Sequence, residues 1–206
     1  MGEASEEEGI VETGKRVAGF YSMALTPFSV AAIESIVFSW FSPTGVGPVM
    51  SSVLSAFFGV LILCIGPFVP VVYSLKTRGT DLDVSDRSKR ASVYLISMTA
   101  YVVGIMVFFV AGNKIMFVLS VAYLCVGLAL MLITLSWKIS AHTAATAGMA
   151  TALWLVLGVW MLPVFVLAAL TIWARVRLGA HTVLQSLAGA LLSIVITALV
   201  FLGLYV

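Results

Sequence analysis

Long apolar segments separated by short polar stretches run through almost the whole of this chain of 206 residues. A helix that crosses the hydrocarbon core of a bilayer needs about 20 predominantly apolar residues. Apolar residues make up 62% of the chain and charged residues 10%, whereas an average soluble domain is about 25% charged. The pattern excludes a water-soluble globule and predicts an all-α fold, a polytopic bundle of membrane-spanning helices.

The positions of the polar stretches divide the chain into six or seven transmembrane helices. The stretch 143–173 is too long for one straight span, and Gly158 and Pro163 predict a turn that splits it into two shorter helices. The count falls from seven to six if the first segment lies in the membrane interface. We expect an acidic N-terminal tail over residues 1–15 and one integral membrane domain over residues 16–206. The remaining predicted spans are 17–40, 48–75, 91–110, 115–135 and 182–205.

The basic residues predict how the chain is oriented. With seven spans, the N-terminus and the loops 76–90, 136–142 and 174–181 share one membrane face, which carries ten of the eleven Lys and Arg residues. Positive charge in short loops marks the cytoplasmic side, so we expect this face to be cytoplasmic in a cell membrane. The net charge of +2 is too small and too scattered for a nucleic-acid-binding surface.

Both histidines of the chain occur in the sequence Ala-His-Thr, at His142 and His181, where a polar loop meets a new apolar helix. A histidine in this position can simply cap backbone groups or anchor the helix among lipid headgroups. The pair, however, shares the predicted face with most of the arginines. Guanidinium groups match phosphate oxygens two at a time, and helix N-termini add N–H groups that favour an anion. One histidine can attack phosphorus while the other protonates the leaving oxygen.

The segment 139–189 carries a resemblance to a known family. Ala174-Arg175, five residues, His181, three residues and Gln185 follow closely the motif S-R-x5-H-x3-D. Ser140-Ala141-His142 is similar to the motif P-S-G-H with its Pro and Gly replaced. In this order and separation, the two motifs resemble those of the type-2 phosphatidic acid phosphatase superfamily, which also includes the vanadium haloperoxidases.

The family's remaining motif, K-x6-R-P, has only a partial counterpart in the loop 76–90. No register places Lys and Arg at both ends, because Asp83 lies seven residues before Arg90 and seven after Lys76. The resemblance points first to Arg90 and then to Arg87 as the phosphate-binding arginine, with Lys76 or Lys89 as a substitute cation. A solvated cytoplasmic loop is the alternative.

The family resemblance implies a role for each of these residues. His181 would be the nucleophile that forms a phosphohistidine, Arg175 and Arg90 would hold the phosphoryl oxygens with help from Ser140, and His142 would protonate the departing alkoxide. No metal or other cofactor is implied. Gln185 replaces the family's Asp, and lies four residues after His181 on the same helix face. We expect its amide oxygen to accept the second ring N–H of His181, without the negative charge that Asp would supply from there; Asp83 or Asp86 could supply that charge instead.

These residues predict a membrane-embedded phosphatase that acts on a lipid phosphate or diphosphate, such as a polyprenyl phosphate or diphosphate, or phosphatidate. The alternatives are a catalytically weak or inactive relative that binds lipids, or a transporter. Glu34 is the only acid or base inside a predicted span, which argues against an ion path. We expect its carboxyl group to reach interfacial water near residues 41–43. The oligomeric state stays open.

Overall fold

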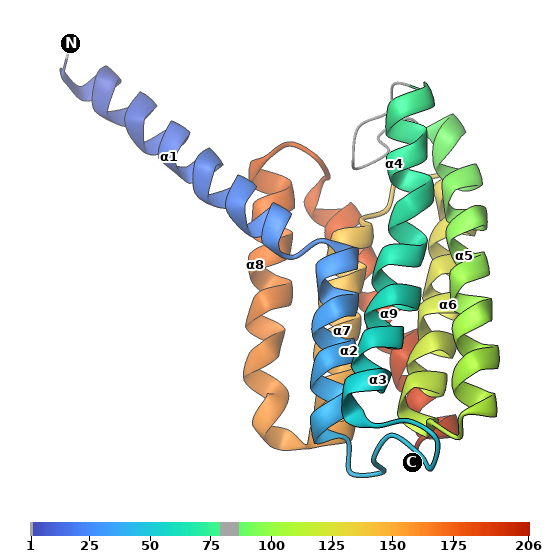
Figure 1. The fold of residues 1–206 in the computed structure, drawn as a ribbon. Helices are drawn as coiled ribbons and strands as arrows, with labels where there is room; N and C mark the ends of the chain where they lie inside the picture. Colours follow the sequence, from blue (N-terminus) through green and yellow to red (C-terminus); the bar gives the residue numbers. More distant parts are fainter. Residues whose placement is uncertain (1, 79–86) are drawn as a thin grey trace.

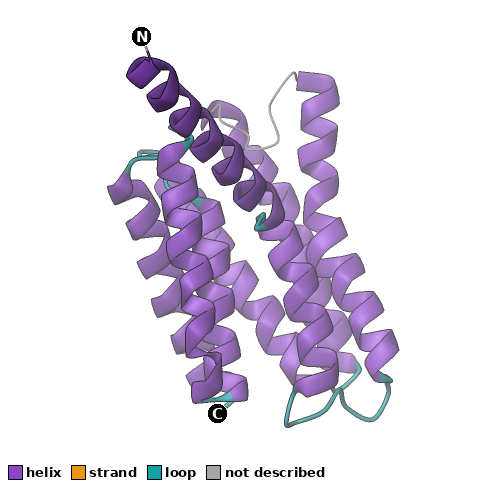
Figure 2. Ribbon diagram, turned by 90° about the vertical axis from the view of Figure 1, so that its left-hand side faces the viewer, coloured by secondary structure: helices purple, strands orange, loops and turns teal. Residues whose placement is uncertain are grey.

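The apolar segments form a bundle of helices that run along a common direction (Figure 1). This structure is a computed structural model; it describes the backbone of residues 2–78 and 87–206, and the side chains of residues 12–77 and 91–206. Within these residues the regular elements are all helices (Figure 2). The all-α prediction is therefore confirmed for the described part of the chain.

The first predicted span is broken in two. Helix α1 (Gly2–Ala24) and helix α2 (Pro27–Phe41) meet at an angle of 51°. Thr26 ends the first helix and caps the second, because its hydroxyl accepts the Ser29 N–H and Pro27 provides a preset first helical residue. The backbone of the acidic N-terminal segment is helical from Gly2 onward and is continuous with the rest of α1. Ala and Glu are strong helix formers, and Glu12 pairs with Arg16 one turn later.

The second predicted span is continuous but irregular. It consists of α3 (Ser52–Gly59), the π-helical segment η1 (Val60–Ile65) and α4 (Gly66–Arg78). The Ser51 hydroxyl accepts the Leu54 N–H and so fixes the start of the helix four residues later than predicted. Next in the chain are α5 (Arg87–Val110) and α6 (Lys114–Thr134), which pack along each other as an antiparallel pair.

The long apolar stretch 143–173 divides as predicted. Helix α7 (Ala141–Leu157) ends at Gly158, whose φ of 88° is unfavourable for other residues. The 3₁₀ segment η2 (Val159–Val164) contains Pro163 and leads into α8 (Phe165–Arg177). The last helix, α9 (Val183–Leu204), lies against α7.

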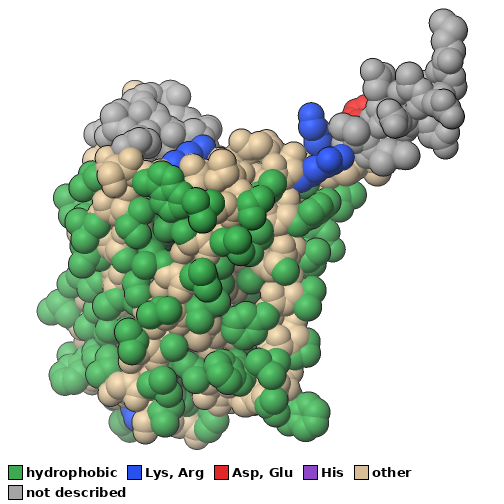
Figure 3. All heavy atoms as spheres, turned by 180° about the vertical axis from the view of Figure 1, so that it is seen from behind, with side chains coloured by type: hydrophobic (Ala, Val, Ile, Leu, Met, Phe, Trp, Pro, Cys, Tyr) green, Lys and Arg blue, Asp and Glu red, His purple; other side chains and the backbone are tan. Residues whose placement is uncertain are grey.

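Among the described residues, five helices are long and apolar enough to cross a membrane, or six if the bent pair α1–α2 counts as one span. Helix α7, at 17 residues, is shorter than this. On the face seen in Figure 3, hydrophobic side chains cover the side of the bundle, and Lys and Arg side chains are seen mainly at its upper end. The structure thus supports an integral membrane protein, and the upper end of the predicted count is not reached.

The connections between helices lie at the two ends of the bundle, and those that carry basic residues share one end, as the sequence analysis predicts. The last turn of α4, the α6–α7 connection and the α8–α9 connection lie at one end, where α1 also projects (Figure 1). Lys114 is at the opposite end, where it donates to the Tyr205 carbonyl at 2.8 Å. Which of these ends faces the cytoplasm stays a prediction.

Candidate functional site

The N-terminus of α7 places His142 in the first turn of a buried helix. Ser140 is completely buried, and its hydroxyl accepts the Thr143 N–H at 3.4 Å, so it is the N-cap of α7. His142 is 9% exposed. Small polar residues cap helices because their side chains satisfy N–H groups that have no partner within the helix. The prediction that a helix begins at this histidine is confirmed.

The α8–α9 turn places His181 next to Arg175. The Arg175 carbonyl accepts the backbone N–H groups of Ala180 at 3.0 Å and of His181 at 3.3 Å. Gly179, with a φ of 67°, allows the chain to reverse there. Arg175 is 4% exposed and His181 is 8% exposed. Arginine is rarely buried unless its guanidinium group has partners.

Direct contacts between α7 and α9 bring the two histidine-bearing segments together. The Ser140 N–H donates to the Gln185 carbonyl at 3.3 Å, and the Thr143 hydroxyl donates to the Ser186 carbonyl at 2.8 Å. Gly189 makes this approach possible, because a Cβ atom there would lie 2.4 Å from the Ser140 oxygen. Segments about 40 residues apart in sequence are thus neighbours at one end of the bundle.

Helix α1 contributes a residue that the sequence analysis did not find. The Ser22 hydroxyl lies 2.8 Å from an Arg175 guanidinium nitrogen and accepts its hydrogen bond, and both residues are buried. Helix α1 packs along α8, with Gly14 beside the Arg177 side chain. A serine in an apolar segment gives no signal of such a contact, since the contact depends on the bend between α1 and α2.

Gln185 has a different hydrogen bond from the one expected. Its Oε1 atom accepts the Thr182 N–H at 3.1 Å, while the Thr182 hydroxyl accepts the Gln185 N–H at 3.2 Å. This reciprocal pair is a capping box at the start of α9. The expectation that Oε1 serves the His181 ring is therefore wrong in this structure. The sequence T-x-x-Q immediately before an apolar run was the available signal.

The residues proposed for the first phosphatase motif are only partly described. Lys76 is exposed in the last turn of α4. The backbone of Arg87, Lys89 and Arg90 forms the first turn of α5, but the side chains of these three residues lie outside the described residues. Asp83 and Asp86 also lie outside them. Their contribution to the site stays a prediction.

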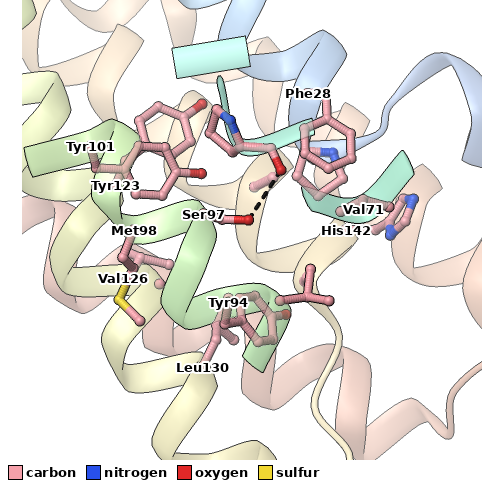
Figure 4. Close-up of a pocket in the computed structure, with 16 residues that line it drawn as sticks. Phe28, Val71, Tyr94, Ser97, Met98, Tyr101, Tyr123, Val126, Leu130 and His142 are labelled. Atoms are coloured by element: carbon pink, nitrogen blue, oxygen red, sulfur yellow. Dashed lines mark hydrogen bonds between the residues drawn. The ribbon is translucent and has the colours of Figure 1, made fainter. Parts of the chain in front are cut away.

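His142 is one of the residues that line an apolar cavity of about 130 Å³. The cavity lies between α2, α4, α5, α6 and α7, and its wall includes Phe28, Tyr94 and Leu130. In Figure 4, His142 and Phe28 are on one side of the cavity, and Tyr101 and Tyr123 are on the opposite side. One of the candidate catalytic side chains therefore borders a space lined mainly by hydrocarbon and aromatic groups.

Glu34 is buried inside the bundle, contrary to the expectation that its carboxyl group reaches water. It is 2% exposed, and its carboxyl group accepts a hydrogen bond from the Tyr123 hydroxyl at 2.5 Å. The ring of Tyr123 stacks on Tyr101 with 5.4 Å between ring centroids. Glu34 and Tyr123 also line a second cavity of about 30 Å³ next to the first. The bundle holds this carboxyl group in its interior because a tyrosine from α6 provides a hydrogen-bond donor.

Within the described part of the chain, no three His, Cys, Asp or Glu side chains are grouped so that they could hold a metal ion. Comparison with protein-family models, with curated proteins and with solved structures finds no match to this chain. The resemblance to the phosphatase superfamily thus depends on the residues and spacings given above.

Proposed function

We propose that this chain is a membrane-embedded phosphatase that hydrolyses a lipid phosphate or diphosphate through a phosphohistidine intermediate. The observation that carries the proposal is the meeting of α7, α8 and α9 at one end of the bundle. There the backbone N–H of His181 donates to the Arg175 carbonyl, and the backbone N–H of Ser140 donates to the Gln185 carbonyl. The three candidate residues His142, His181 and Arg175 are each buried, and these backbone contacts between their segments support a shared site.

The chemistry proceeds in two steps. A ring nitrogen of His181 attacks phosphorus, the bond to the lipid oxygen breaks, and His142 in its protonated form gives its proton to the leaving oxygen. Water then attacks the phosphohistidine with His142 as the base, which releases phosphate and restores both histidines. Arg175 stabilises the charge on the phosphoryl oxygens in both steps. Neither step requires a metal ion.

The apolar cavity supports a lipid as the substrate. His142 lines one side of it, so a phosphate bound beside that ring could extend its tail between the helices. Polyprenyl phosphates, polyprenyl diphosphates and phosphatidate all combine such a headgroup with such a tail. Arg90, Arg87, Lys76 and Lys89 are the further candidates for binding the headgroup, together with Ser140.

One observation favours a second candidate, a lipid-phosphate-binding protein with weak or no catalysis. The side chain of Gln185 is occupied in the capping box and carries no charge. A phosphohistidine mechanism gains from a carboxylate that stabilises the positively charged ring, and Gln185 cannot supply that charge.

The test is phosphate release from the purified protein in detergent, without added metal, using prenyl diphosphate and phosphatidate. We expect His181→Ala to abolish release and His142→Gln to lower it by roughly 100-fold or more. Thr182→Ser, which keeps the capping hydroxyl, is the matched control and should retain the wild-type rate. Mass spectrometry of a reaction quenched at alkaline pH should find phosphate on the peptide that contains His181.

Equal release by wild type and His181→Ala would refute the phosphohistidine proposal. Binding of lipid phosphate by the wild type without any release would favour the second candidate. Gln185→Asp then separates the two further, since a gain of activity would show that a missing charge limits catalysis.

A further inference from the structure

We infer that Tyr123 closes the inner end of the lipid cavity and so limits the length of the tail that the protein can hold. The inference depends on the proposed function for its ligand, a lipid phosphate with its headgroup at His142. It assigns a specificity-determining residue far from the phosphate, at the opposite side of the cavity (Figure 4).

Tyr123 separates two cavities. The large cavity lined by His142 and the small one lined by Glu34 have three lining residues in common, Tyr123, Val126 and Ala145. Tyr123 is the largest of them, and it projects from the middle of α6. A tail that advances from His142 therefore meets this side chain before it can use the space beyond.

Two interactions hold the Tyr123 ring in position. Its hydroxyl donates to the buried Glu34 carboxyl at 2.5 Å, and its face stacks on Tyr101 with an interplanar angle of 28°. Movement of the ring would leave the carboxyl group without this donor inside an apolar bundle, which is costly. The Tyr123 side chain between the two cavities is therefore held rigidly. Holding it is a role for the Glu34 carboxyl group, which the proposed catalytic steps do not use.

The physical basis of selection is steric. A tail that leaves the bilayer for the cavity exchanges one hydrocarbon environment for another, so added methylene groups bring little hydrophobic gain. A tail that is too long must bend or displace packed side chains, as in an overpacked core. Affinity should thus be nearly constant with tail length up to a limit and then decrease.

The experiment measures binding of straight-chain alkyl phosphonates of increasing length to the full chain in lipid nanodiscs, at matched mole fraction. Phosphonates keep the headgroup charge and have no phosphate ester bond to hydrolyse. For the wild type we expect an affinity that decreases by roughly fivefold or more beyond one particular length. Tyr123→Leu should shift this limit to longer tails, because it joins the two cavities.

Two further variants keep the result decisive if Tyr123→Leu folds poorly. Ala145→Val adds bulk at the same partition and should shift the limit to shorter tails. Tyr123→Phe keeps the ring and its stack on Tyr101 but loses the hydrogen bond to Glu34, so the decrease in affinity should begin at the same tail length and become less steep.

A wild-type affinity without a length limit, or a limit that is the same in all variants, would overturn the inference. A limit that moves as expected in a protein that releases no phosphate would support the inference and refute the enzymatic proposal. Phosphate release by a protein whose binding shows no length limit would support the enzymatic proposal and overturn the inference about Tyr123.

Discussion

Replacing Gly189 by alanine tests whether the close contact of α7 and α9 builds the site. A Cβ atom at this position would lie 2.4 Å from the Ser140 carbonyl oxygen and 2.8 Å from the Thr143 hydroxyl. The nearer atom is backbone, so the clash cannot be relieved by turning a side chain. The two helices must separate near their first turns, beside His142 in α7 and the turn before α9 that carries His181.

The expected magnitude follows from two opposing effects. Alanine gains up to about 1 kcal/mol over glycine inside a helix, whereas overpacking costs about 1–3 kcal/mol. Because the clash involves backbone, we expect the upper part of that range, and a net loss of about 1–2 kcal/mol. A displacement of catalytic groups by about 1 Å lowers rates by about 100-fold, so phosphate release should fall by roughly 10- to 100-fold.

The assay compares Gly189→Ala with Gly203→Ala, which lies in the same helix and has no atom within 4 Å of the added Cβ. Thermal unfolding in detergent should show a lower Tm for Gly189→Ala only, and phosphate release should decrease for that variant only. If both variants match the wild type in Tm and rate, the α7–α9 contact does not determine the geometry of the site.

Three further predictions concern other contacts. Ser22→Ala removes the hydroxyl that accepts the Arg175 hydrogen bond. Because a bond to a charged group contributes about 1.5–3 kcal/mol, inhibition of phosphate release by vanadate should weaken by roughly tenfold. Unchanged inhibition would exclude a role of Ser22 in positioning Arg175. Gln185→Met breaks the capping box and should lower the unfolding free energy by about 1 kcal/mol, while Gln185→Glu should preserve both the capping box and the stability. Equal Tm values for the two variants would contradict the role of Gln185 in the capping box. Lys114→Met removes the 2.8 Å bond to the end of α9, so hydrogen exchange should increase over the last turn of that helix and stay unchanged near His181.

The membrane fold and the division of the chain into spans were predictable, because they depend on local properties. Hydropathy identified the spans, and Gly158 with Pro163 located the turn between α7 and α8. The bend between α1 and α2 was missed although Thr26-Pro27 is a local signal for a helix start. The apolar composition on both sides of these residues concealed it.

The sequence alone also brought attention to His142, His181 and Arg175, since residue type and spacing are enough to suggest phosphate chemistry. It misassigned Gln185, whose partner is decided by competition between a ring N–H and a backbone N–H at the start of α9. It could not pair Ser22 with Arg175, or Tyr123 with Glu34. These contacts join side chains from different helices.

The sequence by itself therefore determined that the chain is a helical membrane protein with two histidines at helix starts. Only the tertiary structure decided that these two helix starts adjoin, that α1 reaches Arg175, and that Tyr123 separates two cavities. The physical reason is that hydropathy and capping act within one helix or turn. The rotation and depth at which helices meet depend instead on how their surfaces pack, as at Gly189, where the missing side chain lets the Ser140 carbonyl approach.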